Sequence, residues 1–266
     1  MPLGAEIRGT EITMRILVVN ANTSDIVTDK VAAQARLSAS TGTEIVSVTG
    51  TFGARVIGSR AEHAIGEHST LALIAQHAPG CDAVVIAVSY DTGLRAAREL
   101  LPIPVVGMTE SGLLTACMLG GRIGVITFGR RVLPLYRELV TSYGLDPRIA
   151  GWRTLESTAA YQRGTHDALD TLDRELVEAA LDLVERDGAE TVVLTGAVMA
   201  GVPARLQKGV PVPLIDCIAC AVRQSELLHH LGYPKPSVGS YSPPAGRELI
   251  ALDPALAVAF ANAGKP

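Results

Sequence analysis

Polar residues stand at the ends of three apolar runs that have the length of buried strands, and they are the first candidates for chemistry. In α/β proteins, ligands bind at the carboxyl ends of the parallel strands. Hydroxyls, amides and the backbone N–H groups that open a following helix suit a carboxylate or an imide oxygen. The candidates are Asn20, Asn22, Thr23 and Ser24 at the end of MRILVVN, Ser89, Tyr90, Asp91 and Thr92 after CDAVVIAV, and Thr195 after TVVL.

Two side chains of the second loop could take part in a reaction directly. Asp91 could serve as a base if the cleft around it is dry, because burial raises the pKa of a carboxyl group. It could equally orient the loop, or cap the helix expected at 92–101. Tyr90 could donate a hydrogen bond to a developing oxyanion, or simply fill the cleft. Helix capping is also the alternative reading of the first loop, ANTS.

The strands and helices expected to position these loops alternate along the chain, as in an α/β protein. Strands are expected at 14–20, 43–48, 83–88, 105–107, 123–127, 191–196 and 214–216. Helices are expected at about 25–36, 71–77, 94–101, 111–119, 132–143, 171–187 and 218–228. Strands that alternate with helices in this way predict mostly parallel sheets flanked by helices.

The pattern also repeats within the chain. The segment VVIAVSYDTGLRAARELLPIPVVGM can be laid over VVLTGAVMAGVPARLQKGVPVPLIDC, so that Val84 falls on Val192 and Val88 on Gly196. Two such halves predict two pseudosymmetric lobes, with the loops ANTS, AVSYD, TFG and LTGAVMAG meeting in a cleft between them. The expected lobes are 14–113 with about 219–250, and about 114–218, after a disordered tail at 1–13. A chance recurrence of P-V-P text is the alternative.

The segments MRILVVNANTS, VVGMTES, GRIGVITFGRR, VVLTGAVMAG, PLIDCIACAV and GSYSPP, in this order, resemble the hydantoin racemase family of the Asp/Glu racemase superfamily. The resemblance covers about 14–244 and implies a two-lobed, pseudosymmetric α/β fold. It implies racemisation without a cofactor, in which a cysteine thiolate removes the α-proton and a second cysteine supplies a proton to the opposite face. It also suggests an even-numbered homo-oligomer.

This sequence departs from the family at both cysteine positions, where it has Val88 and Gly196. Neither residue can take or give a proton, so the two-thiol mechanism cannot run. Cys217 is either a displaced thiol, to be considered for catalysis beside Asp91 and Tyr90, or a packed small residue. The residues that the resemblance and the loops place at the substrate are Asn20, Asn22, Thr23, Ser24, Val88, Ser89, Thr92, Glu110, Thr127, Thr195, Gly196, Ala197 and Asp216.

Bulk composition excludes several classes of function. Hydrophobic residues make up 48% of the 266 residues, which indicates a folded protein, and a net charge of −4 argues against a nucleic-acid partner. No apolar run approaches the roughly 20 residues of a membrane helix, and four cysteines without a signal peptide favour reduced thiols in the cytoplasm. The C-I-A-C at Cys217 and Cys220 has no second pair, and His63 and His68 are five residues apart, so no metal is expected.

Three hypotheses remain. The favoured one is a cofactor-independent enzyme that acts on a small hydantoin-, lactam-, imide- or amino-acid-like carbonyl compound by hydrolase, lyase or isomerase chemistry. The alternative is a non-catalytic protein on a racemase fold that binds a small ligand. The third, ranked last, is a true racemase inactivated by substitution of both cysteines.

Overall fold

The computed structural model describes residues 13–156, 166–244, 246, 250 and 253–262. It contains two four-stranded sheets, and every strand pairing in them is parallel. The first sheet has the order β2 (Thr43–Thr49), β1 (Met14–Asn20), β3 (Ala83–Ile86) and β4 (Val105–Gly107). The second has the order β6 (Ile149–Leu155), β5 (Ile123–Phe128), β7 (Thr191–Leu194) and β8 (Leu214–Asp216).

The identical strand order confirms the two pseudosymmetric halves that the repeat predicts. β3 and β7 occupy the same place in their sheets, and both are buried at every residue. Strands buried on both faces read as continuous apolar runs, which is why AVVI and TVVL could be found in the sequence. The α/β class with two parallel sheets is confirmed as well.

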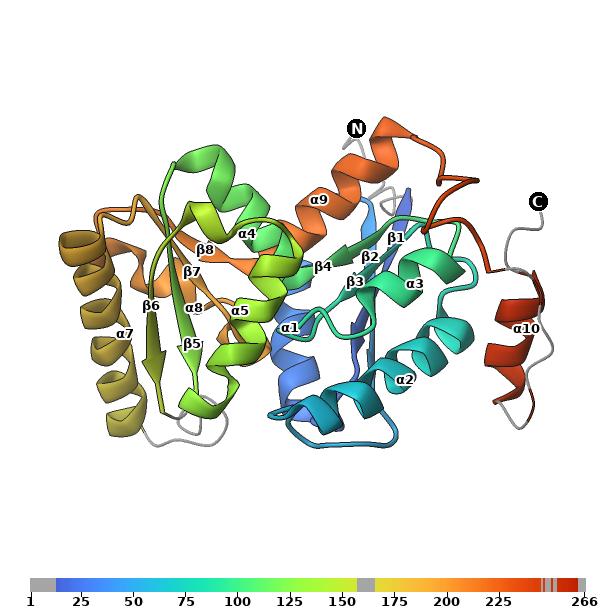
Figure 1. Ribbon diagram of the computed structural model, residues 1–266, viewed down its shortest axis with the longest axis horizontal. Helices are drawn as coiled ribbons and strands as arrows, with labels where there is room; N and C mark the ends of the chain where they lie inside the picture. The colour runs from blue at the N-terminus through green and yellow to red at the C-terminus, as the bar shows by residue number, and fades with distance from the viewer. Residues whose placement is uncertain (1–12, 157–165, 245, 247–249, 251–252, 263–266) are drawn as a thin grey trace, which may run out of the picture.

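The helices cover the sheets, and two of them pack on the sheet of the other lobe (Figure 1). α4 (Met108–Leu119) follows the first sheet but packs on β7 and β8, and α9 (Cys217–Leu231) follows the second sheet but packs on β3 and β4. The two helices also pack on each other, so the central apolar core runs from one lobe into the other. The expected lobe boundaries remain a prediction, and the expected tail falls outside the described residues except for Thr13.

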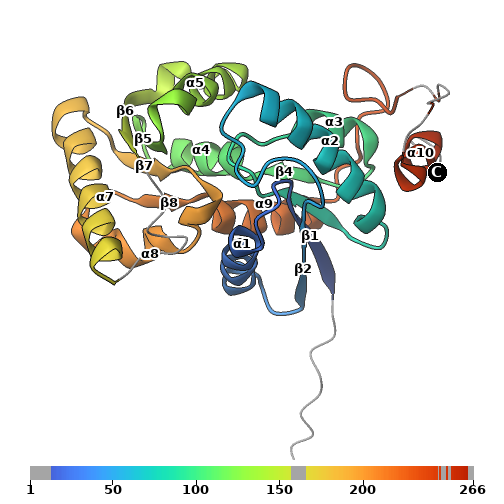
Figure 2. The same cartoon turned by 90° about the horizontal axis from the view of Figure 1, so that it is seen from below.

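The remaining α-helices complete the two lobes. They are α1 (Asp25–Ser38), α2 (Arg60–His77), α3 (Leu94–Leu100), α5 (Leu133–Ser142), α7 (His166–Asp187), α8 (Val202–Leu206) and α10 (Pro254–Asn262). Figure 2 shows α5 of the second lobe beside α2 of the first, with α7 and α10 at opposite ends of the molecule. None of the helices among the described residues is long and apolar enough to cross a membrane.

Some elements differ from the sequence prediction. The strands expected at 83–88 and 191–196 end two residues earlier, so Val88 and Gly196 lie in the loops beyond them. The edge strand β6 was not predicted, because each of its residues is only half-buried and the sequence IAGWRTL lacks a clear alternation. α2 begins at Arg60 rather than at 71. Ser59 and Glu62 form a reciprocal capping pair at this earlier start.

Candidate active site

A cleft of about 360 Å³ lies between the lobes, at the carboxyl ends of the strands. It brings together the loop after β3, the loop after β7, the start of α5 and the segment before α2. Its walls are mainly apolar. The lining residues are Asn22, Val27, Val56, Ile57, Gly58, Val88, Ser89, Tyr90, Phe128, Gly129, Val132, Tyr136, Glu156, Gly196, Ala197 and Val198.

Val88 and Gly196, at which the sequence resemblance places the two family cysteines, both line this cleft. Val88 is 4% exposed. Gly196 adopts φ 107°, a conformation that favours glycine. The two loops touch directly, because the backbone N–H of Ala197 donates to Ser89 Oγ at 3.0 Å. The convergence of the AVSYD and LTGAVMAG loops is therefore present in the structure.

Hydroxyl groups occupy the centre of the cleft. Tyr90 comes from the first lobe and Tyr136 from α5 of the second, with their ring centroids 4.6 Å apart. Burial raises the pKa of Tyr136, while hydrogen bonding with Thr195, Ser89 and Tyr90 lowers it by a smaller amount. Burial, followed by the proximity of Tyr136, also raises the pKa of Tyr90. Both phenols therefore keep their protons at neutral pH and can act as hydrogen-bond donors or acids.

The same cleft offers few groups that can accept a proton. Among its described lining residues, the ionisable side chains are Tyr90, Tyr136 and Glu156. Glu156 forms an ion pair with Arg130 at 2.8 Å, and its side chain is 66% exposed. An exposed, paired carboxylate is a weak candidate for abstracting the proton of a carbon acid, since such a base must be desolvated and aligned.

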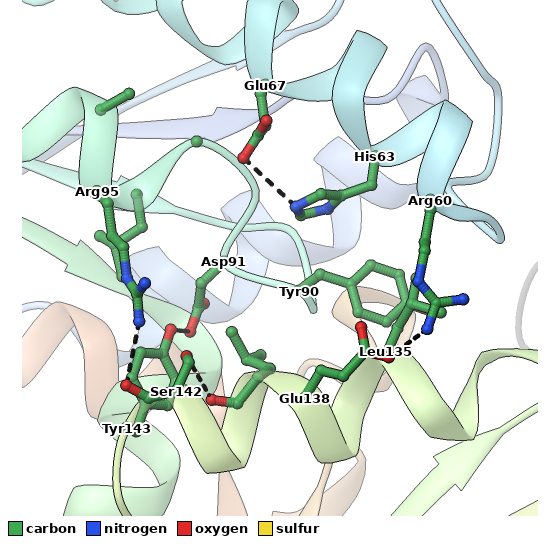
Figure 3. Close-up of a pocket in the computed structure, with 14 residues that line it drawn as sticks. Arg60, His63, Glu67, Tyr90, Asp91, Arg95, Leu135, Glu138, Ser142 and Tyr143 are labelled. Carbon is green, nitrogen blue, oxygen red and sulfur yellow. Dashed lines mark hydrogen bonds and ion pairs between the residues drawn. The ribbon is translucent and has the colours of Figure 1, made fainter.

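Asp91 lies on the other side of Tyr90, in a second pocket of about 270 Å³ between α2, α3 and α5 (Figure 3). It is 4% exposed. Burial raises the pKa of Asp91 to about 7, against the opposing effect of hydrogen bonds from the Tyr143 hydroxyl and from the backbone N–H groups of Thr109 and Glu110. Tyr90 lines both pockets and separates Asp91 from the cleft.

Of the ANTS loop, Asn22 lines the cleft. Asn20 is buried, and its amide donates to Asn22 Oδ1 at 3.0 Å and to Thr28 Oγ1 at 2.9 Å. Ser24 is the N-cap residue of α1, although its side chain makes no capping hydrogen bond. The backbone N–H of Thr23 donates to Ala54. Three of these four residues thus shape the loop, and Asn22 faces the ligand space.

The remaining predicted site residues point into the protein. Glu110 pairs with Arg98, Thr92 Oγ1 contacts His63 Nδ1 at 3.1 Å, and Thr127 Oγ1 contacts Thr154 Oγ1 at 3.1 Å. Asp216 caps α9 by accepting from the backbone N–H groups of Ile218 and Ala219.

Cys217 lies away from both pockets. It is 2% exposed, and its thiol lies 3.5 Å from the carbonyl oxygen of Leu194. Burial raises the pKa of Cys217 well above that of a free thiol. A buried thiol of this kind behaves as a packed apolar residue rather than as a nucleophile or base.

His63 and His68 turn toward different neighbours. His63 pairs with Glu67 at 3.5 Å, whereas the ring of His68 packs against Phe52 with centroids 5.4 Å apart. Within the part of the chain that the structure describes, no group of three or more His, Cys, Asp or Glu side chains could hold a metal ion.

Sequence reasoning missed Tyr136 and the segment Val56–Gly58. The sequence does contain a signal for Tyr136, because Leu135, Tyr136 and Val140 recur at helical spacing and form the buried face of α5. Nothing in the sequence marks which lobe that face meets. Val56–Gly58 lies in irregular structure before α2, where periodicity gives no guidance.

Comparison with known proteins agrees with this architecture. The profile of the Asp/Glu/Hydantoin racemase family matches residues 16–225. A hydantoin racemase of Paenarthrobacter aurescens is 32% identical over 240 residues, which cover 89% of this chain and 100% of the relative. The solved structure of an allantoin racemase from Klebsiella pneumoniae superposes with a TM-score of 0.85 at 31% identity, covering 92% of this chain and 99% of that one. An allantoin racemase from Pseudomonas fluorescens gives a TM-score of 0.83 at 31% identity, with 90% and 100% covered. The chain belongs to the Asp/Glu/hydantoin racemase family.

Proposed function

We propose that this chain is a cofactor-independent lyase that decarboxylates a small carbonyl compound, by a mechanism that uses tyrosine hydroxyls instead of the cysteine pair. The observation that carries the proposal is the pair Tyr90 and Tyr136, two protonated phenols in contact in the cleft that Val88 and Gly196 also line. The cleft thus has acids, while its one described carboxylate is exposed and paired.

A cleft with two protonated phenols and only an exposed, paired carboxylate favours one way of making a carbanion. Racemisation needs a base to remove an α-proton and an acid to return one. Decarboxylation reaches the same enolate without a base, because the electrons of the breaking carbon–carboxylate bond move into the enolate as CO2 leaves. One phenol can donate a hydrogen bond to the enolate oxygen. The other can protonate the enolate carbon and regain its proton from water, so that one proton is consumed for each CO2 released.

The walls of the cleft support a compact, partly apolar substrate. Val88, Val132, Val198 and Phe128 disfavour the charge of a carboxylate and tolerate neutral CO2. The side-chain amide of Asn22, which lines the cleft, suits a second carbonyl or imide oxygen. The relatives are named for hydantoin and allantoin, so carboxylated rings of the hydantoin type come first, followed by lactams, imides, amino acids and substituted malonates.

The test is a proton NMR assay of this panel in D2O. The lyase predicts a product that carries one deuterium at the α-carbon, with no deuterium in the recovered substrate. Tyr136→Phe should lower kcat by about 10²-fold, the usual effect of removing one oxyanion donor. The exposed Tyr233→Phe is the matched control.

Three outcomes would overturn the proposal. Deuterium in the recovered substrate would show racemase-type proton abstraction. Ring-opened products would show a hydrolase. Line broadening of one compound without turnover would favour the alternative, a non-catalytic ligand-binding protein.

A further inference from the structure

The backbone of Asp91 is unusual. Among the described residues other than glycine, Asp91 alone has a positive φ, 48°. It directly follows Tyr90 in the loop that carries Val88 and Ser89 into the cleft. Such a conformation costs free energy and persists where the surroundings fix it. Whatever holds the Asp91 side chain therefore also fixes the neighbouring Tyr90.

Three donors from two elements hold the Asp91 carboxylate. The backbone N–H of Thr109 donates to Oδ1 at 2.9 Å, and that of Glu110 donates to Oδ2 at 2.8 Å. Both belong to the first turn of α4, where the helix dipole favours a negative charge. The Tyr143 hydroxyl, from the end of α5, donates to Oδ2 at 2.7 Å. The carboxylate is thus fully engaged and does not face the substrate cleft.

Asp91 thus caps the N-terminus of α4, and in the second half of the chain a different residue caps the corresponding helix, α9. There Asp216, at the end of β8, caps α9 and accepts from the backbone N–H of Gly201 at 2.6 Å. The repeat places Gly107 at the position of Asp216. A Cβ on Gly107 would lie 2.5 Å from Asp91 Cγ, so the Asp91 carboxylate fills the space that a side chain at 107 would take. In the first half, the cap therefore comes from the active-site loop itself.

Tyr143 carries this contact to the other lobe. It follows α5 directly, seven residues and two helical turns after Tyr136, so both side chains lie on the same face of α5. Two further contacts fasten α5 to the first lobe: Arg60 pairs with Glu138, and Arg95 donates to the carbonyl oxygen of Ser142 at 3.1 Å (Figure 3). The Asp91–Tyr143 hydrogen bond is the most buried of the three.

We infer that Asp91 is a positioning residue, whose hydrogen bond to Tyr143 holds α5 against the first lobe and thereby sets Tyr136 opposite Tyr90. This role replaces the base considered for Asp91 from the sequence. The expected effect of Asp91 on turnover rests on the proposed function. Its effect on the positions of Tyr90 and Tyr136 does not, because that effect is a property of the protein without substrate. Asp91 acts on the reaction through the two phenols and touches neither cleft nor substrate.

The test is NMR of protein labelled with 13C at tyrosine Cζ, in Tyr143→Phe, with Tyr233→Phe as the matched control. Tyr143→Phe keeps the ring and removes only the hydroxyl. We expect the Tyr90 and Tyr136 signals to shift in Tyr143→Phe and to stay in place in Tyr233→Phe. With a turned-over compound, kcat should fall by about 10²-fold while KM stays within about twofold, as expected when reacting groups are displaced by about 1 Å.

Asp91→Asn is the second variant, in case Tyr143→Phe fails to fold. Unchanged Tyr90 and Tyr136 signals in a folded variant would overturn the inference, even if kcat fell. Shifted signals in a protein that turns over none of the compounds would support the inference and count against the proposed function. The two failures are therefore separable.

Discussion

Replacing Asp91 by asparagine should change how the stability of the protein depends on pH. Burial raises the pKa of Asp91 to about 7 in the folded protein, whereas an unfolded aspartate titrates near 3.8. Between these two values the folded state binds a proton that the unfolded state has released. The free energy of unfolding contributed by this group must therefore fall as the pH rises from about 4 to about 7. This sign is opposite to that of an ion-paired carboxylate, whose pKa folding lowers.

The size of the effect follows from the same two values. At 1.36 kcal/mol per pKa unit, the interval corresponds to about 4 kcal/mol. An asparagine side chain cannot titrate, so the stability advantage of the wild type over Asp91→Asn should be largest near pH 4 and should shrink by up to about 4 kcal/mol by pH 8. Other groups titrate in both proteins and cancel in the difference.

The assay is urea unfolding between pH 4 and 8, followed by the fluorescence of Trp152, the single tryptophan, which packs against the apolar cluster of the cleft. Asp29→Asn, at an exposed aspartate of α1, makes the same change in net charge and is the matched control. If the difference for Asp91→Asn were flat or grew with pH, the carboxylate would be ionised throughout the range. The three donors would then outweigh its burial, contrary to the expected balance.

Three further predictions concern packing around the site. Gly107→Ala should lower the free energy of unfolding by about 1–3 kcal/mol, because its Cβ would overlap the Asp91 carboxyl, whereas Gly58→Ala, with its nearest atom at 3.7 Å, should change it little; thermal unfolding measures both. Cys217 should be the slowest of the four cysteines to react with iodoacetamide at pH 8, since burial raises its pKa and shields its thiol; rapid labelling by mass spectrometry would contradict this. In Val88→Cys, the new thiol lines the cleft and should be alkylated at least about tenfold faster than Cys217, and equal rates would show that residue 88 is closed to small molecules.

The sequence predicted the fold well where most residues of a strand are buried. β1, β4 and β8 begin and end where the runs MRILVVN, VVG and LID place them, because strands covered on both faces are rich in apolar residues. It failed at β6, a half-buried edge strand in which Arg153 pairs with Asp182 and Asp187 of the distant helix α7. A local pattern cannot show such a partner.

The sequence predicted which two loops meet at the site, but it did not predict which side chains the site brings together. The repeat predicted that the loops AVSYD and LTGAVMAG converge, and in the structure a hydrogen bond joins Ser89 of one to Ala197 of the other. Tyr136 enters the cleft from a helix that reads as ordinary packing, and only the tertiary structure sets it beside Tyr90. The role of Asp91 was equally hidden, since Thr109 and Tyr143 lie 18 and 52 residues away from it along the chain.

Val88 and Gly196, which the sequence resemblance places at the two cysteine positions of the family, are not equivalent, although the internal repeat relates them. Val88 has an ordinary backbone conformation and could accept another small side chain. Gly196 has φ 107°, so any other residue there would be strained, even though its Cβ would meet only ordinary contacts with Met199 and Phe128 at 3.5 and 3.6 Å. A cysteine at position 196 would be strained, whereas the contact between Tyr90 and Tyr136 is already formed in the wild-type chain. A site of this kind supports reactions that need an acid and an oxyanion donor on one side of the substrate more readily than reactions that need matched groups on both.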